Sequence, residues 1–337
     1  MHARRRVPKR LAINGWAISS RDMSAISRPP CNMSGSLRAA TKTPSEVALH
    51  RQGVIRVTLA ALIWSTGGLI VRSLGSADVW TTVFWRGVFS AAFLLAYIGW
   101  CERGQIVRVF RAMGLPGVVV ALSLGASSTC LVIAFSLTSV ANTLIIFSTS
   151  PLIAAVLGRL LLGEHVQANG WLVMLLAVVG VAIMVSASFA PGSLLGDLLA
   201  LLVALGSAFV TVMIRKYRDV RMTPATCLGA LFTALAAFPL ATPLAVSTGD
   251  FGLLFVFGAF QHGAGLALYT RAAQLIPVAQ VAIISLLEPI LGSVWVWIFL
   301  DEHPGPMALI GSGIVLSALA SYMAMDLRRA RPIPPAV

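Results

Sequence analysis

The chain has 337 residues, of which 58% are hydrophobic and only 11% are charged, and its mean hydropathy is +0.87. A soluble domain of this size carries roughly a quarter charged residues, so a water-soluble enzyme is excluded. The net charge of +13 does not indicate a nucleic-acid partner, because 11 of the 25 Lys and Arg residues precede Val57 and the others lie at the ends of apolar segments. The composition predicts an integral membrane protein.

Residues 1–53 are expected to form a basic, disordered cytoplasmic tail. They are rich in Arg, Ser and Pro and show no sustained hydrophobic period. The apolar stretch that begins near Leu11 is too short for the core of a secretory signal. Met23 and Met33 offer internal starts, so the sequence leaves open how much of this tail is translated.

Beyond the tail, apolar stretches of about twenty residues recur, each long enough to cross a hydrocarbon core of about 30 Å. The predicted spans are residues 55–72, 80–100, 113–133, 138–162, 169–187, 195–214, 224–246, 252–271, 278–300 and 306–325. The connections between them are too short for a further domain. The sequence therefore predicts an all-α membrane protein with ten transmembrane helices.

Basic residues cluster at alternate ends of these spans. They are Arg51, Arg56, Arg103, Arg108, Arg111, Arg215, Lys216, Arg218, Arg221, Arg271, Arg328, Arg329 and Arg331. The opposite ends hold little basic charge beyond Arg72. By the positive-inside rule both termini are cytoplasmic, which requires an even number of spans.

The chain contains an internal repeat. The segment Val140–His165 aligns without a gap with Val278–His303, and Pro151 and Glu164 fall in register with Pro289 and Glu302. Five spans separate the two copies, so the copies must face opposite sides of the membrane. We expect two inverted five-helix repeats, residues 54–187 and 193–326, followed by a short basic cytoplasmic tail, 327–337. Inverted repeats are typical of alternating-access transporters.

At this point the sequence resembles the EamA type of the drug/metabolite transporter superfamily. The resemblance rests on Ala60-Ala61-Leu62-Ile63-Trp64-Ser65, on Phe84-Trp85-Arg86, and on the two Pro-x12-Glu spacings, the second of which includes Leu287-Glu288-Pro289-Ile290. It covers residues 54–326 and implies a ten-helix transporter of small metabolites, often an exporter, in the bacterial inner membrane. It leaves the solute, the coupling ion and a homodimer open, and the long basic tail departs from the family pattern.

Glu288 is the first candidate for a functional residue. It lies about eleven residues into the ninth span, roughly 16 Å deep at 1.5 Å per residue. An ionised carboxylate at that depth is costly, so we expect it to be paired, hydrated or protonated. It marks either a proton or substrate site or a hydrogen bond that caps the helix break at Pro289.

Arg86, in the outer third of the second span, is the second candidate. It suits an anionic group on the solute, a pair with Glu288, or an interfacial position reached by its long stem. Together with Glu288 it is compatible with a zwitterionic solute.

Pro151 and Pro289 are expected to break the fourth and ninth spans at corresponding positions, because each removes a helical hydrogen bond. Paired breaks point to a transporter site, although a kink needed only for packing has the same signature.

The remaining candidates for the solute pathway are polar or aromatic residues inside spans. They are Trp64, Asn142, Ser148, Gln280, His262 and Tyr269, and Gln261 lies beside His262. Hydrogen bonding between helices would require the same residue types. No second His or Cys lies at ligand spacing from His262, so neither a metal nor another cofactor is predicted.

Three functions compete at this point. The leading one is a secondary transporter of a small organic solute, with protons as the candidate coupling ion. No phosphate-binding loop is present, which disfavours direct use of ATP. A lipid flippase or scramblase is the alternative. An intramembrane enzyme is not expected, because no nucleophile, base or metal ligands converge in the sequence.

Overall fold

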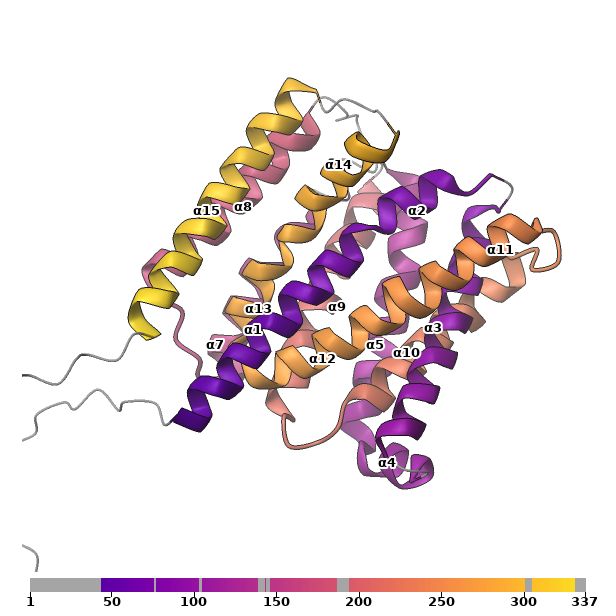
Figure 1. Ribbon diagram of the computed structural model, residues 1–337, viewed down its shortest axis with the longest axis horizontal. Coiled ribbons are helices and arrows are strands. Elements are labelled where there is room, and N and C mark those ends of the chain that lie inside the picture. Colours follow the sequence, from indigo (N-terminus) through magenta and orange to yellow (C-terminus); the bar gives the residue numbers. More distant parts are fainter. Residues whose placement is uncertain are drawn as a thin grey trace, which may run out of the picture. The chain divides into compact units, whose positions relative to one another are not determined.

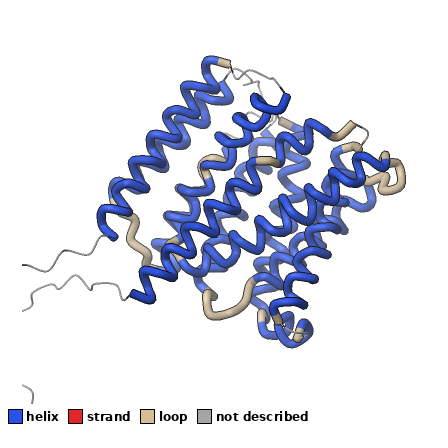
Figure 2. Tube along the Cα trace, in the orientation of Figure 1, coloured by secondary structure: helices blue, strands red, loops and turns tan. Residues whose placement is uncertain are grey.

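The computed structural model describes residues 44–75, 77–102, 105–138, 143, 146–186, 194–300 and 305–330. Every element in these ranges is a helix (Figure 2). Seven of the described helical segments are long and apolar enough to cross a membrane, and three shorter apolar helices lie within the predicted fourth, fifth and tenth spans. The chain is therefore an all-helical, multi-pass membrane protein.

The first half of the chain holds four long helices and several shorter ones. They are α1 Pro44–Ser65, α2 Gly67–Ser73, α3 Val79–Cys101, α4 Ile106–Ala112, α5 Gly114–Leu137, α7 Ser150–Leu162 and α8 Ala168–Val185. Helices α1 and α2 continue in one direction with a break at Thr66 (Figure 1). The short helix α4 connects the predicted second and third spans.

The second half follows the same pattern with more interruptions. Its elements are α9 Leu194–Lys216, α10 Thr223–Ala237, the 3₁₀ helix η3 Phe238–Leu240, α11 Thr248–Phe255, the π-helix η4 Val256–Ala264, α12 Gly265–Leu275, α13 Val278–Ser285, α14 Leu287–Leu300 and α15 Pro306–Ala330. Helices α11, η4 and α12 follow one another without a gap and form the predicted eighth span.

Three helices differ in extent from the predicted spans. Helix α1 begins at Pro44, before the predicted first span, because proline suits the first turn of a helix. Helix α10 and the 3₁₀ turn end at Leu240, short of the predicted residue 246, since Pro239 and Pro243 cannot continue a helix. Helix α15 continues to Ala330, into the predicted C-terminal tail. The remaining tail residues, 1–43 and 331–337, lie outside the described ranges.

The helices pack in a pattern that repeats between the halves. Three contacts join corresponding spans, namely α3 with α10, α7 with α13, and α8 with α15 (Figure 1). The others occur in corresponding pairs. The contact of α5 with α9 corresponds to that of α12 with α1, and the contact of α5 with α10 corresponds to that of η4 with α3. The contact of α7 with α9 corresponds to that of α14 with α1. Exchanging the first five spans with the last five leaves this set of contacts unchanged.

Small residues allow the closest of these contacts. A Cβ on Gly87 of α3 would lie 2.8 Å from the carbonyl oxygen of Ala230 in α10. A Cβ on Gly258 of η4 would lie 2.9 Å from the carbonyl oxygen of Arg86. Helix α3 is therefore held between two backbones at close range, as small residues permit in membrane helices. This packing fixes the height and direction of Arg86.

Candidate functional site

Arg86 of α3 and Glu288 of α14 lie close enough inside the protein to interact electrostatically. Both side chains are surrounded by protein, yet each keeps some accessible surface. Within the described part of the chain, neither makes a hydrogen bond or an ion pair shorter than 4.0 Å. The structure thus brings the two main candidates together without joining them directly.

The guanidinium group of Arg86 is oriented by an aromatic ring. Its Cζ lies 5.5 Å from the ring centroid of Phe257, which is buried in η4. A cation–π contact of this kind leaves the N–H donors of the guanidinium group available. His262, also in η4, interacts electrostatically with Arg86. The π-helix therefore contributes two neighbours of the arginine, in addition to Glu288 of α14.

Trp64 and Tyr269 form the aromatic wall next to Glu288. Their ring centroids are 5.2 Å apart, and the Tyr269 hydroxyl lies 2.7 Å from Thr211 Oγ1. Tyr269 also interacts electrostatically with Glu288. The indole of Trp64 fits because residue 265 is glycine, since a Cβ there would lie 2.1 Å from Trp64 Nε1.

The π-helix η4 presents a buried amide to the same region. Gln261 Nε2 donates a hydrogen bond of 2.8 Å to the backbone oxygen of Trp64, whereas Gln261 Oε1 is buried without a partner. Trp64 Nε1 is also buried without a partner. One unsatisfied acceptor and one unsatisfied donor therefore lie at this junction, and π-helical turns often occur at functional sites.

Helix breaks lie beside these side chains. The first span breaks at Thr66, whose hydroxyl donates to the backbone oxygen of Ile63, and Trp295 Nε1 of α14 donates to Ser65 Oγ over 2.8 Å. The ninth span breaks at Leu286, between α13 and α14, and Glu288 lies in the first turn of α14. Pro289 follows directly, and Pro151 lies at the corresponding first turn of α7.

Of the other candidates, Gln280 makes a side-chain contact that lies away from this cluster. Gln280 lies near the start of α13, where its Oε1 is 2.9 Å from His50 Nε2, so it holds α1 to α13. Ser148 is buried in the turn before α7. Asn142 lies outside the described residues. The fourth-span residues are thus not shown to line the same site.

The sequence did not predict Phe257, Thr211 or Trp295, which all support the site. Hydropathy does not distinguish an aromatic side chain that contacts a cation from an aromatic side chain that packs in an apolar core. His262 lies in the π-helix, which ends at Ala264, and Tyr269 lies in the α-helix that follows it. Closely spaced glycines at 258, 263 and 265 were the available signal for an irregular, closely packed helix.

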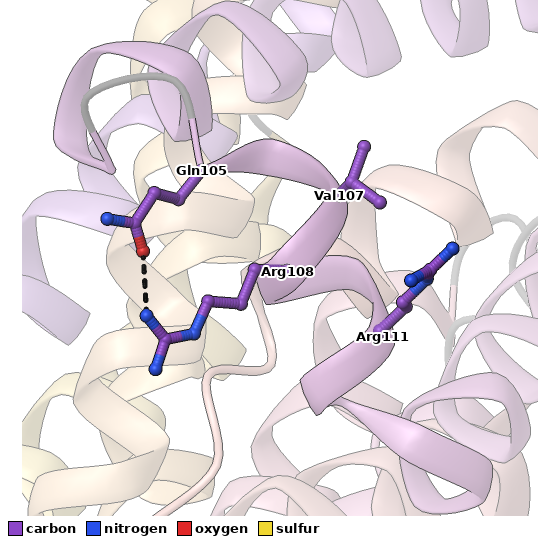
Figure 3. A pocket seen from close by; sticks show the side chains of 4 residues that line it. All are labelled: Gln105, Val107, Arg108 and Arg111. Atoms are coloured by element: carbon purple, nitrogen blue, oxygen red, sulfur yellow. Dashed lines mark hydrogen bonds between the residues drawn. The ribbon is translucent and has the colours of Figure 1, made fainter.

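A separate hollow of about 420 Å³ lies on the surface around α4 (Figure 3). Its lining residues are Gln105, Val107, Arg108 and Arg111, and Arg108 donates a hydrogen bond of 3.2 Å to Gln105. It contains none of the predicted site residues. No group of three potential metal ligands occurs among the described residues of the chain. The cluster of Arg86, His262, Glu288, Trp64, Gln261 and Tyr269, called the central cluster below, remains the candidate site.

Chemically, the central cluster combines a cation, a carboxyl group, an imidazole, an amide and two aromatic rings. Such a set recognises a small polar solute by charge, hydrogen bonds and ring contacts. The carboxyl group is also able to exchange a proton with water or with a bound amine. No nucleophile is paired with a base among these side chains.

Comparisons with known proteins place the chain in a family. The search of curated proteins found no match. One solved crystal structure of a protein matches with a TM-score of 0.72 and 19% identity, covering 84% of this chain and 100% of the other, which indicates a shared fold. The model of the EamA-like transporter family matches twice, over residues 51–186 and 194–323. Because these two matches account for most of its length, the chain belongs to the EamA-like transporter family.

Proposed function

We propose that this protein is a secondary transporter that exports a small organic solute by alternating access. In this proposal protons drive export through Glu288, and the protein lies in the bacterial inner membrane with both termini in the cytoplasm. The two halves are inverted repeats, and the solute binds between them at the central cluster. Neither a metal nor another cofactor is required.

The packing of the helices supports alternating access. Three contacts of the first five spans, those of α5 with α9, α5 with α10 and α7 with α9, have counterparts in the last five, as expected if equivalent contacts close the two ends in turn. The aligned segments Val140–His165 and Val278–His303 support the same relation at the level of sequence. Broken helices beside the central cluster are the feature that transporters with inverted repeats place at their substrate sites.

The observation that carries the proposal is the unjoined pair of Arg86 and Glu288. Two opposite charges inside a membrane protein are expected to form a direct ion pair, because an unpaired charge there is costly. Here both groups keep some accessible surface and, among the described residues, share no mutual hydrogen bond. A solute or water between them would satisfy both charges, and proton binding at Glu288 would release a bound cationic group.

The test compares export by cells that contain the wild type, Glu288→Gln or no transporter. Extracellular metabolites are measured by mass spectrometry at matched membrane expression, with and without a proton gradient across the membrane. The wild type is expected to enrich at least one solute outside. Glu288→Gln is expected to reduce that enrichment at least about tenfold and to remove its dependence on the gradient.

A matched control separates the role of Glu288 from a general loss of charge. Asp219→Asn makes the same carboxyl-to-amide change at an exposed residue in the connection between α9 and α10. It is expected to export like the wild type. Export by Glu288→Gln that still follows the proton gradient would contradict proton coupling at this residue. Movement of lipid analogues without any exported solute would favour the flippase alternative.

A further inference from the structure

The carboxylate of Glu164 joins the two halves at the end of the bundle that is expected to face the cytoplasm, where Glu102 also pairs with Arg221 across the halves. Glu164 belongs to the first half, residues 51–186, and its partners belong to the second half, residues 194–323. Glu164 Oε1 accepts a hydrogen bond of 2.9 Å from Arg215 Nε at the end of α9. Its other oxygen, Oε2, accepts a bond of 3.0 Å from the backbone N–H of Val278, the first residue of α13.

The end of α7 places Glu164 in this position. Gly163 has a φ of +68°, the left-handed conformation that ends many helices. The N–H of Gly163 then bonds to Arg159, and the N–H of Glu164 bonds to the carbonyl oxygen of Gly158 over 3.3 Å. The turn directs the carboxylate away from α7, toward α9 and α13. Its position is therefore built into the backbone.

Arg215 is held by a second bond on the far side. Its Nη1 donates to the backbone oxygen of Gln274 over 2.7 Å, and Gln274 Nε2 donates to the backbone oxygen of Val220 over 2.7 Å. These bonds connect the ends of α9 and α12 and the loop after α9. One carboxylate from the first half thus meets a preformed set of donors in the second half. Both ionic side chains are largely shielded, with exposed fractions of 15% and 21%.

The backbones are also in close contact directly beneath this junction. A Cβ on Gly158 of α7 would lie 3.6 Å from Val278 Cβ and 3.9 Å from Glu164 Oε2. No room remains for a solute between α7 and the start of α13 at this level. The two halves are closed here.

We propose that Glu164 is the latch that keeps this end of the transporter closed. For the end to open, the carboxylate must release Arg215 and the N–H of Val278 together, so that α7 separates from α9 and α13. This inference rests on the proposed alternating-access function. It assigns Glu164 and Arg215 to control of access, apart from the binding of solute at the central cluster.

Access to a reporter cysteine measures the latch without any known solute. Ser285→Cys is introduced after the four native cysteines have been replaced, since Ser285 lies at the inner end of α13, about 10 Å from Val278 along the helix. Inside-out vesicles expose the cytoplasmic end to a thiol reagent that does not cross membranes. Glu164→Gln and Arg215→Gln are expected to raise the labelling rate roughly threefold to tenfold, because each weakens a charged hydrogen bond that holds the closed state.

Two matched controls lie at the same end of the bundle. Arg159→Gln removes a positive charge from the exposed face of α7, and Asp219→Asn removes an exposed negative charge after α9. Neither side chain has an ion-pair partner among the residues that the structure describes. Both variants are expected to label at the rate of the parent. Arg215→Lys keeps the positive charge and loses the planar guanidinium group, so we expect an intermediate labelling rate and a well-folded protein.

A disulfide provides the opposite perturbation. The pair Gly158→Cys and Val278→Cys would place its two Cβ atoms at the separation that disulfides require. In a chain with only these two cysteines, oxidation is expected to lock the closed end and to stop export. A reductant is expected to restore it. Continued export by the fully cross-linked protein would overturn the latch.

The labelling assay also separates the latch from the proposed function. Faster labelling in the latch variants alone, without any detectable exported solute, would support the latch and contradict export. Unchanged labelling in Glu164→Gln, Arg215→Gln and Arg215→Lys, with melting temperatures equal to that of the parent, would overturn the latch whatever the transport assay shows.

Discussion

Single residues place the polar groups of this membrane protein. Glu288 and Arg86 were predictable because charges inside apolar spans are rare and costly. Trp64 and Tyr269 were predicted as candidates, but their contact was not, because it depends on the missing side chain of Gly265. The unpartnered oxygen of Gln261 also depends on a π-turn that hydropathy does not indicate. The positions of the buried charges could be predicted from the sequence, whereas the close contacts between helices could not.

Gly265→Ala tests whether close approach positions the aromatic wall. A Cβ at residue 265 would lie 2.1 Å from Trp64 Nε1, so the indole must move. Overpacking of this kind costs about 1–3 kcal/mol, more than the helix propensity gained by replacing glycine. We expect a lower melting temperature in detergent and a changed tryptophan fluorescence spectrum.

Gly313→Ala is the matched control for this prediction. Gly313 also lies within a helix, α15, but no atom comes within 4 Å of a Cβ placed there. This variant is expected to be as stable as the wild type or slightly more stable. Equal stability of both variants would mean that the Trp64 indole relaxes without cost, and that Gly265 does not position it.

At the scale of elements, apolar length predicted where helices lie but not where they break. Each predicted span contains a helix in the described residues, because a length of about twenty apolar residues is a requirement of the membrane. The break at Thr66 and the π-helix η4 contain no proline and left no signal of that kind. Conversely, Pro239 and Pro243 indicated an early end of α10, but the span predicted from hydropathy continued past them to residue 246.

The start of α3 supplies a prediction on pH. Asp78 caps this helix by accepting bonds from the N–H groups of Trp80 and Thr81, and Thr242 donates a bond of 3.0 Å to it from the loop after α10. Partial burial raises the pKa of Asp78, but these hydrogen bonds outweigh that effect and hold the pKa below its ordinary value of 3.8. A depressed folded pKa means that the stabilisation is complete above pH 3.8 and is lost as the pH falls through the folded value.

We therefore expect the melting temperature of the wild type to fall more than that of Asp78→Asn when the pH is lowered from about 5 to about 3. At neutral pH, Asp78→Ala is expected to cost about 1 kcal/mol, the usual contribution of a helix cap. Asp219→Asn serves as the exposed control and should follow the wild type across this pH range. If the melting temperatures of Asp78→Asn and the wild type fell equally with pH, protonation of Asp78 would not weaken the helix cap.

At the scale of the whole molecule, the packing relates one half of the chain to the other. The EamA-like family model matches both halves, and several helix contacts of one half have counterparts in the other. The aligned Pro and Glu residues anticipated this relation, because a shared spacing of polar residues and prolines survives where apolar residues are interchangeable. Which elements meet across the halves was not predictable, since it is decided by small residues such as Gly87 and Gly258.

Orientation across the membrane follows from the same relation and has its own test. If five spans separate the copies, the chain after Gln167 lies in the cytoplasm and the chain after Gly305 lies outside, although both follow corresponding helices. Truncated fusions to green fluorescent protein and to alkaline phosphatase report the inside and the outside respectively. We expect fluorescence after Gln167 and after Val337, and phosphatase activity after Gly305. If the fusions after Gln167 and after Gly305 both reported the same side of the membrane, the result would contradict inverted repeats. In that case the basic residues Arg215, Lys216 and Arg218 would not orient the second half as the positive-inside rule requires.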